Sequence, residues 1–352
     1  MEQEKLLKLE KSTENLRNKK LRIYFLAQDT KGNAKASISY IYRMAKVLYD
    51  DGFNAIILHE KNDYVGVGSW LGQEYMELPH KSIDGQNLEI SPEDFIIIPE
   101  LYGFVMSQIS NLPCGKIVLS QAYDHILETL QPGTTWAQVG FHKCITTSEF
   151  QKDYISNLMR GCSIDVIEPI ISNKFTKSET PAKPIVAVHT REQRDTHNLI
   201  KNFYVKFPQY RWITFKDMRG LTESEFAETM KDCFLSVWID DVSGYGTFPL
   251  ESMKSGVPVL GYVPNLLPHW INEDNGLWVN NKLQIVDFIA DFLQNWLEDN
   301  IDQKLFDEMD KTVTSLQSEE DFKNKVIDTF DEYVKIRLES FESQLTKLQE
   351  TE

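Results

Sequence analysis

The 352-residue sequence is poor in basic residues: 37 Lys and Arg stand against 53 Asp and Glu, which gives a net charge of −16. A general nucleic-acid binder more often carries a basic surface, so this composition disfavours that class of protein. Strong attraction to anionic lipid is disfavoured on the same grounds. A local basic pocket for one diphosphate stays compatible with the sequence, because net charge averages over the whole surface.

Cysteines and long apolar runs are also scarce. The four cysteines, Cys114, Cys144, Cys162 and Cys233, show no zinc-type pairing, and their apolar surroundings favour buried free thiols in a reducing cytoplasm over disulfides. No window has the length and apolarity of a membrane span, and residues 1–20 lack the apolar stretch of a signal peptide. We therefore expect a cytoplasmic protein with no transmembrane segment.

Two ligand-binding motifs are absent as well. The chain has no Asp-x-Asp pair, which disfavours a metal-held nucleotide diphosphate, because the metal ion would need carboxylates besides the phosphate oxygens. The loop Gln28–Ala36 lacks the full Gly-x-Gly-x-x-Gly fingerprint of nicotinamide and flavin enzymes. We expect neither a cofactor nor a metal site.

What the sequence does contain is a repeated alternation of short apolar runs with helical patterns, which is typical of doubly wound α/β domains. Its length predicts two domains. We expect a helical extension (1–19), a first Rossmann-like domain (20–172), a linker rich in Lys, Ser, Thr and Pro (173–184), a second Rossmann-like domain (185–318), and a C-terminal helix whose acidic end is frayed or self-associating (319–352).

Several local patterns predict where elements begin and end. Thr147 or Ser148 is placed to cap the helix that follows, and Thr222 with Glu225 forms a capping-box pattern. Residues 63–87 are predicted to be irregular, and the run Ile164–Ile171 is predicted to be a strand.

The stretch from Cys233 to Pro264 is the most informative. An apolar run, Phe234–Ile239, predicts a buried strand, and a Gly-Tyr-Gly turn, Gly244–Gly246, follows it. Thr247 is placed to cap a short helix, after which the chain returns as a second buried strand. The resulting βαβ unit presents backbone N–H groups at a helix N-terminus, where a diphosphate binds readily.

This stretch resembles the nucleotide-binding signature of GT-B-fold glycosyltransferases, especially the retaining enzymes of glycosyltransferase family 4. Their pattern, acid-x-Gly-aromatic-Gly-x-x-x-x-Glu followed by small-Gly-x-Pro-Val, is matched here by Gly244–Gly246, Glu251 and Ser255–Val259. The sequence departs from the pattern at Ser243, which aligns with the first glutamate of the family. Asp241 is the nearest acid that could replace its charge.

The resemblance implies an α/β protein of the GT-B fold, with two Rossmann-like doubly wound domains facing a central cleft. It also implies C-terminal helices, of which the last packs back toward the first domain. The implied activity is a hexosyltransferase-like glycosyltransferase of polysaccharide biosynthesis, retaining and metal-independent. Its donor would be a nucleotide-diphosphate sugar, and its acceptor a glycan, a lipid-linked sugar or a protein. A homo-oligomer is possible.

Two other functions stay open. One is a degenerate GT-B module that binds a sugar or a partner protein without turnover, which Ser243 favours. The other is a nucleotide-sugar epimerase, for which Asp124, His125 and Glu100 are the nearest acid/base candidates.

Basic residues in the second domain are candidates for the departing diphosphate, because arginine can clamp phosphate oxygens with two hydrogen bonds. Arg191 and Arg194 follow the first apolar run of this domain, and Lys216 is expected in the exit loop of the next strand. The catalytic residues implied are Arg191, Lys216 and Glu251. The predicted donor-binding residues are Arg194, Asp241, Ser243, Gly244, Tyr245, Gly246, Thr247 and Glu251.

Two loops of the first domain supply the candidates for the acceptor or the donor sugar. Gly32, Asn33 and Lys35 lie in the loop after the first strand, and Gln121, Tyr123 and His125 follow a later strand. Loops at the carboxyl ends of parallel strands commonly carry function. For His125 the alternative is a histidine that is packed or solvated in the following helix.

Overall fold

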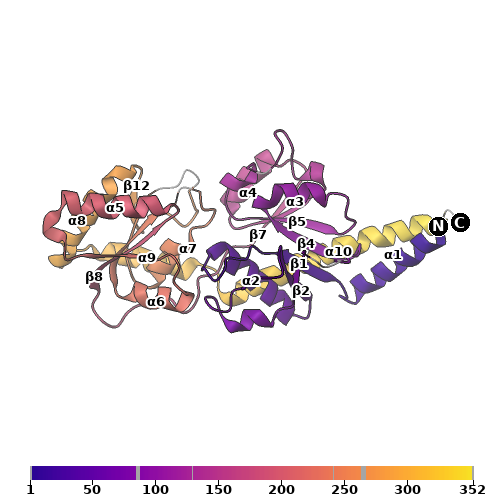
Figure 1. Cartoon of the computed structure of the whole chain (residues 1–352), viewed down its shortest axis with the longest axis horizontal. Coiled ribbons are helices and arrows are strands. Elements are labelled where there is room, and N and C mark those ends of the chain that lie inside the picture. Colours follow the sequence, from indigo (N-terminus) through magenta and orange to yellow (C-terminus); the bar gives the residue numbers. More distant parts are fainter. Residues whose placement is uncertain (1, 85–87, 129, 241, 263–266, 351–352) are drawn as a thin grey trace. The chain divides into compact units, whose positions relative to one another are not determined.

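The computed structural model describes residues 2–84, 88–128, 130–240, 242–262 and 267–350. The chain divides into two units, which are described separately here: unit 1 is made of residues 1–168 and 318–352, and unit 2 of residues 169–317. Each unit contains one parallel sheet with helices packed against it (Figure 1). The prediction of an α/β chain with two doubly wound sheets and C-terminal helices is confirmed.

Unit 1 is built on a seven-stranded sheet in the order β3-β2-β1-β4-β5-β6-β7. From β1 the chain runs outward to β2 on one side, and it later returns to β4 on the other side. The carboxyl ends of β1 and β4 therefore flank the switch point of this sheet, where ligands bind in open α/β folds. Its helices and strands are α1 (Glu2–Arg17), β1 (Arg22–Leu26), α2 (Ala36–Asp50), β2 (Asn54–His59), β3 (His80–Ser82), β4 (Phe95–Pro99), α3 (Gly103–Gln108), β5 (Gly115–Ser120), β6 (Lys143–Thr146), α4 (Glu149–Leu158), β7 (Ser163–Val166) and α10 (Glu319–Glu350).

The last helix, α10, covers one face of this sheet. Phe322, Val326 and Phe330 recur at helical spacing and are at most 1% exposed, and the Phe330 ring lies 6.0 Å from that of Phe25 in β1. Tyr333 donates a hydrogen bond of 2.6 Å from its hydroxyl to Asp165 Oδ2. Long-range contacts of this kind fix α10 within unit 1 although it is far from the strands in sequence.

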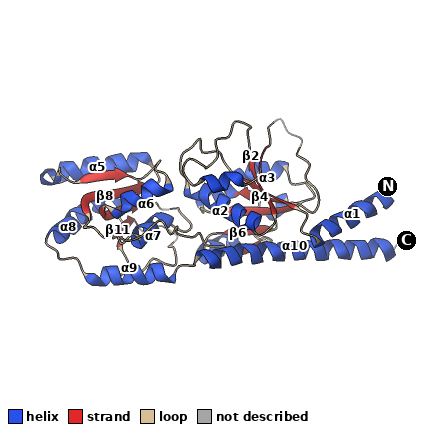
Figure 2. Ribbon diagram, turned by 90° about the horizontal axis from the view of Figure 1, so that it is seen from below, coloured by secondary structure: helices blue, strands red, loops and turns tan. Residues whose placement is uncertain are grey.

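Beyond the sheet, α10 continues beside α1, as both ribbon views show (Figures 1 and 2). Arg17 at the end of α1 pairs with Glu342 of α10 at 2.6 Å. The acidic end of the chain is helical as far as Glu350, so the expectation of a frayed end is wrong for residues 339–350. The contact with α1 supplies the order that the charged sequence alone did not indicate.

Unit 2 has a five-stranded sheet in the order β12-β11-β10-β8-β9. Its switch point lies between β8 and β10, because β8 connects outward to β9 before the chain returns to β10 on the other side. Its elements are β8 (Lys183–Thr190), α5 (Gln193–Lys206), β9 (Thr214–Asp217), α6 (Glu223–Lys231), β10 (Cys233–Ile239), α7 (Thr247–Lys254), β11 (Val259–Tyr262), β12 (Leu277–Val279), α8 (Ile285–Leu297) and α9 (Gln303–Ser315).

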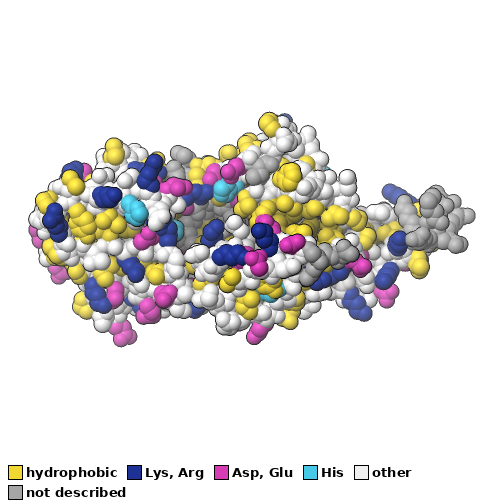
Figure 3. All heavy atoms as spheres, in the orientation of Figure 1, with side chains coloured by type: hydrophobic (Ala, Val, Ile, Leu, Met, Phe, Trp, Pro, Cys, Tyr) yellow, Lys and Arg dark blue, Asp and Glu magenta, His cyan; other side chains and the backbone are white. Residues whose placement is uncertain are grey.

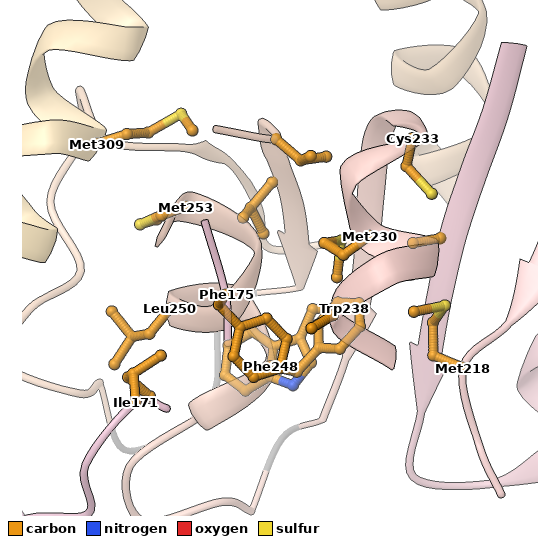
Figure 4. Packing of buried hydrophobic residues seen from close by; sticks show 14 of the residues in the cluster. Ile171, Phe175, Met218, Met230, Cys233, Trp238, Phe248, Leu250, Met253 and Met309 are labelled. Carbon is orange, nitrogen blue, oxygen red and sulfur yellow. The ribbon is translucent and has the colours of Figure 1, made fainter. Parts of the chain in front are cut away.

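Two hydrophobic clusters join this sheet to the helices packed against it. One joins the strands to α5 and α8, and the other joins them to α6, α7 and α9. In the second, Trp238 of β10 and Phe248 of α7 are both part of the packed interior (Figure 4). All seven residues of β10 are buried, which explains why this strand stands out in the sequence as a continuous apolar run.

Of the local sequence predictions, the two helix caps are confirmed and the extents of two segments are wrong. Ser148 caps α4 by accepting a hydrogen bond from Gln151 N, and the capping box of Thr222 and Glu225 is present in α6, so both predictions are confirmed. Residues 63–87 were expected to be irregular, but they contain the short strand β3. The strand predicted at Ile164–Ile171 ends already at Val166.

Candidate functional site

The switch point of unit 2 is organised by Asp240, which directly follows β10. Asp240 Oδ1 accepts hydrogen bonds from the backbone N–H groups of Val242 and Ser243, both at 3.1 Å. Arg191, the first residue after β8, donates its backbone N–H to Ile239 O at 3.0 Å. Its guanidinium Nη1 lies 3.8 Å from Asp240 Oδ1. At the carboxyl ends of the neighbouring strands β8 and β10, a carboxylate therefore faces an arginine.

The glycine turn leads from this carboxylate into α7. Ser243 Oγ accepts a hydrogen bond of 3.1 Å from Gly246 N. Gly246 precedes the helix with φ +76°, and a Cβ at this position would lie 3.1 Å from the Trp238 ring and 3.2 Å from the Trp270 ring. Glycine is favoured here, because a side chain would be strained by the backbone conformation and would lie close to both tryptophan rings.

The predicted role of Thr247 as a helix cap is wrong. Thr247 is the first residue of α7, and the capping position belongs to Gly246, which has no side chain with which to cap. The first N–H groups of α7 therefore have no side-chain cap at that position. Such an uncapped helix start is suited to hold an anion.

The other donor-side candidates are distributed as follows. Tyr245 is 3% exposed and packs in the core, and its carbonyl accepts a hydrogen bond of 2.7 Å from Trp270 Nε1. Glu251 is half-buried in α7, one turn inside the helix. Gly244 lies between Ser243 and Tyr245 in the turn, and Asp241 falls outside the described residues.

The candidate basic residues of unit 2 lie in two places, near the carboxyl edge of the sheet and within a strand. Arg194 is exposed in the first turn of α5, close in sequence to Arg191. Lys216 is exposed within β9, opposite Ala187 of β8, and not in the exit loop where it was expected. The structure therefore brings Arg191 to the carboxyl edge together with the glycine turn, but it places Lys216 short of that edge.

Both Lys216 and Arg219 were expected in the exit loop of β9, and only Arg219 lies there. It pairs with Asp217, with 2.9 Å between Arg219 Nε and Asp217 Oδ1, and its Nη2 lies 3.4 Å from Thr196 Oγ1. The hydrogen bond from Arg219 holds the pKa of Asp217 below its usual value. Beside this pair, burial lowers the pKa of His189, whose ring stacks on Phe248 at 5.0 Å. The edge of unit 2 thus holds two carboxylates, each with its arginine.

In unit 1 the loop after β1 contains the predicted residues Gly32, Asn33 and Lys35. Gly32 has φ +83°, and Asn33 Nδ2 donates to Thr30 O at 2.9 Å, so both residues shape the turn. Lys35 is exposed at the start of α2, and its Nζ lies 3.3 Å from Gln28 Oε1. This loop presents polar groups at the carboxyl end of β1.

The second set of unit 1 candidates follows β5. Gln121 Nε2 donates to Ser37 O at 3.2 Å, which links this loop to the first turn of α2. The Tyr123 ring contacts Tyr154 edge to face, and His125 Nδ1 lies 2.5 Å from Glu128 Oε2. The structure therefore brings Gln121 together with the loop after β1, whereas Tyr123 lies against Tyr154 of α4 and His125 lies beside Glu128 and acts electrostatically on Glu100.

A buried carboxyl group, Glu100, lies between these two loops. It directly follows β4 and is 2% exposed, and its Oε1 accepts hydrogen bonds from Gln121 N at 2.9 Å and from Ala122 N at 2.8 Å. Burial raises its pKa to about 7. The sequence named Glu100 only for the epimerase alternative. The signal was an acid that directly follows the apolar run Phe95–Pro99.

Among the residues that the structure describes, no three His, Cys, Asp or Glu side chains gather as metal ligands would. Within the same residues no helix combines the length and apolarity that crossing a membrane requires. On the face drawn in Figure 3, Lys and Arg side chains are scattered among acidic ones and form no broad basic area.

Comparison with known proteins identifies the fold. No protein-family model and no curated protein sequence matches the chain, but many solved structures do. Sucrose-phosphate synthase from Thermosynechococcus elongatus superposes with a TM-score of 0.62 at 14% identity, over 89% of this chain and 99% of that one. HepE from Anabaena in complex with UDP and glucose also gives 0.62, at 13% identity, over 89% of this chain and all of its own.

A third similar structure is the pneumococcal O-GlcNAc transferase GtfA in complex with UDP and GlcNAc. Its TM-score is 0.51 at 12% identity, over 70% of this chain and 57% of that one. These proteins are GT-B glycosyltransferases, so the chain has the GT-B fold, and this expectation from the resemblance is confirmed. At such low identity the likeness shows the fold and leaves the activity to the residues of the site.

Proposed function

We propose that the chain is a glycosyltransferase that moves a sugar from a nucleotide-diphosphate-sugar donor to an acceptor hydroxyl. The observation that carries the proposal is the carboxyl edge of unit 2. There Arg191, the turn at Ser243–Gly246 and the uncapped start of α7 meet at the switch point. A diphosphate at this edge would gain a cation and the backbone N–H groups of Thr247 and Phe248 at the start of α7. The similar structures support this, since HepE and GtfA were solved with UDP.

The proposed division of labour follows the sequence candidates. Arg191, with Arg194, would neutralise the charge that develops on the departing diphosphate, which is electrostatic catalysis directed at the leaving group. Glu251 would accept hydrogen bonds from the ribose or the donor sugar. Retention at the anomeric carbon, independence of metal ions and a role in polysaccharide biosynthesis complete the proposal, as the resemblance to family 4 implies.

One observation favours the second candidate, a GT-B module that binds without turnover. Ser243 replaces the first glutamate of the family signature, and its hydroxyl accepts a hydrogen bond from Gly246 N. The side chain therefore stabilises the turn but brings no negative charge to it. A site that keeps the shape of the turn without the acid is suited to bind a nucleotide sugar, and catalysis would then depend on the remaining residues.

The experiment that tests the proposal is a thermal-shift panel with UDP, GDP and ADP, without added metal. A ligand that binds only the folded state stabilises it by about 2.7 kcal/mol at a hundred times its Kd. We expect one nucleotide to raise the Tm of the wild type, and we expect Arg191→Ala and Glu251→Ala each to reduce that shift.

The matched control is Arg211→Ala. Arg211 is exposed in unit 2 but precedes β9, at the opposite end of the strands from the switch point. Its removal changes the net charge as Arg191→Ala does, and it should leave the nucleotide shift intact. If no nucleotide at millimolar concentration shifts the Tm of the wild type, the proposal fails. If a nucleotide sugar binds without hydrolysis or transfer, the binding module is the better description.

A further inference from the structure

Two histidines of unit 1 that the proposed donor site does not use form a hydrogen-bonded pair. His59 ends β2 and is 1% exposed, and His80 begins the neighbouring strand β3. His59 Nε2 lies 2.9 Å from His80 Nδ1, with 8° between the two ring planes. The ring of Tyr64 covers the pair, stacking on His59 at 4.0 Å and on His80 at 5.2 Å. The three rings therefore form one packed cluster.

The hydrogen bonds of this pair suit neutral rings. One N–H between His59 Nε2 and His80 Nδ1 satisfies both of these nitrogens. The other ring nitrogen of His59, Nδ1, is enclosed and has no hydrogen-bond partner among the described residues. A protonated imidazole carries an N–H on each nitrogen, so a proton added to His59 would leave a buried donor without an acceptor.

The titratable groups that face the pair come from three other parts of unit 1. Tyr64 belongs to the segment after β2, and Tyr42 of α2 has its ring 5.9 Å from that of His80. Asp29, in the loop after β1, favours the charged form of His59, but burial and the neighbouring imidazole outweigh it and lower the pKa of His59 to about 4. Burial also lowers the pKa of His80, against one backbone hydrogen bond. Both rings are therefore largely uncharged at pH 7.

The segment that supplies Tyr64, residues 60–79, joins β2 to β3 and has little regular structure besides a short 3₁₀ turn. It is attached to the loop after β1, because Asp29 accepts hydrogen bonds from Val65 N at 3.1 Å and from Gly66 N at 3.3 Å. The same loop contains three of the predicted acceptor-side residues. A change that releases Tyr64 from the histidines should therefore loosen both the segment and this loop.

We propose that the His59–His80 pair is an acid-sensitive latch, in which protonation of His59 separates the rings from Tyr64 and opens the segment 60–79. At neutral pH the uncharged rings hold the segment closed. In the open state His59 is solvated and regains the ordinary histidine pKa of about 6.5, so the open state binds the proton more tightly. The stability of the closed state is therefore complete above about pH 6.5 and is lost as the pH falls toward 4. The latch does not depend on transferase activity.

The test is hydrogen exchange of the full chain, followed by mass spectrometry on peptides from residues 60–79 at pH 5.0 and 7.5. Exchange times are scaled for the pH dependence of the intrinsic amide rate, so that the opening equilibria are compared. With a pKa of about 4 in the closed state and about 6.5 in the open state, the segment should open about 30-fold more often at pH 5.0 than at pH 7.5. Peptides from β5 and α4 should change by less than about twofold.

The variant His59→Gln keeps a side-chain N–H near the position of Nε2, so it can still bond to His80, but it takes up no proton in this pH range. Its exchange at pH 7.5 should stay within about threefold of the wild type, and the ratio between the two pH values should fall about fivefold or more. The matched control is His142→Gln. His142 is an exposed histidine of unit 1 just before β6, with Nδ1 3.3 Å from Gly161 O, and its removal should leave the ratio unchanged.

Two exchange results would overturn the proposal. A wild-type segment whose opening differs by less than about twofold between the two pH values excludes the latch. A ratio that His59→Gln leaves unchanged also excludes it, because the pH dependence then comes from other groups. If His59→Gln already opens the segment at pH 7.5, NMR of the histidine rings in the wild type decides. A His59 ring that titrates near the ordinary value of about 6.5 refutes the latch, and one that is still neutral at pH 5.5 supports it.

Discussion

The two sheets are both doubly wound, but the carboxyl groups at their switch points have opposite surroundings. In unit 2 Asp240 faces Arg191 and Asp217 faces Arg219, and both pairs are partly exposed. In unit 1 Glu100 is buried, with backbone N–H groups and no ion pair among the described residues. Arginine pairs keep carboxylates charged, whereas burial without a cation favours the protonated form.

This difference shows how one topology supports two kinds of chemistry. The edge of unit 2 holds fixed charges and helix N–H groups, which suit the binding of a diphosphate. The edge of unit 1 holds a carboxyl group whose pKa is raised to about 7 by burial, so its protonation changes near neutral pH. The two strand orders differ, but both sheets are doubly wound and have a switch point, and the residues directly after the strands distinguish the two edges.

The largest effect should come from the glycine turn of unit 2. Gly246→Ala places a side chain in a left-handed conformation and against the rings of Trp238 and Trp270. Backbone strain and overpacking each cost about 1–3 kcal/mol, so we expect unfolding to become easier by about 3 kcal/mol or more. Nucleotide binding should be lost with the turn. Urea unfolding followed by tryptophan fluorescence measures the first effect, and calorimetry with UDP the second.

The matched variant in unit 1 is Gly32→Ala. Gly32 also has a positive φ, +83°, but a Cβ there meets only Ser69 Oγ at 3.8 Å. We expect a cost of about 1 kcal/mol, from the backbone alone. If Gly32→Ala and Gly246→Ala lower the free energy of unfolding equally, the tryptophan rings do not restrict the turn of unit 2. The two glycine turns would then not differ in packing.

The glycine turn also marks what the sequence made predictable. The continuous apolar run of β10 and the spacing from Gly244 to Glu251 predicted the βαβ unit and its helix, because local pattern and tertiary burial agree there. The cap could not be assigned from sequence. A threonine at the start of a helix is normally the cap, and only the left-handed φ of Gly246 moves that position back by one residue.

The second effect concerns Glu100 and pH. Its pKa is raised from 4.5 to about 7 in the folded chain, so the folded state holds the proton more tightly than the unfolded state does. The stability that this proton provides is complete below about pH 4.5 and is lost as the pH rises through 7. The shift corresponds to about 3 kcal/mol. Glu100→Gln has no such proton, so the stability of the wild type relative to the variant should fall by up to that amount between pH 4.5 and 8.

Chemical denaturation of both proteins at several pH values measures this difference. A relative stability that stays constant from pH 4.5 to 8 would mean that the carboxyl group is as well solvated in the folded chain as in the unfolded one. Unit 1 would then hold a charged carboxylate at its switch point, as unit 2 does, and the contrast between the two edges would disappear.

The importance of Glu100 was hard to derive from the sequence for a physical reason. An acid after a buried strand is normally a solvated loop residue, and nothing in its neighbourhood along the chain indicates burial. The loop that covers it follows β5, twenty-one residues further on at Gln121. In the same way β3 escaped prediction, because His80–Ser82 has no apolar run and is a strand only through its pairing with β2. Features of this kind are made by tertiary contacts.

The smallest effects should come from the exposed pair of unit 2, Asp217 and Arg219. About a third of each side chain is exposed, so the pair itself contributes about 1 kcal/mol or less to stability. Its influence on an anion should be easier to measure. Asp217→Asn removes a negative charge from the edge and should tighten UDP binding a few-fold at low salt, whereas Arg219→Ala should weaken it. Titration calorimetry with UDP in 25 mM and 500 mM NaCl measures both.

Salt separates the electrostatic explanation from a structural one. At 500 mM NaCl the Debye length falls to about 4 Å, so both changes in affinity should shrink toward the wild type if they arise from charge. Two variants that weaken binding equally, at both salt concentrations, would instead show that the pair shapes the exit loop of β9. The affinity of this edge for a diphosphate would then come from Arg191 and the start of α7, and the role of Arg219 would be structural.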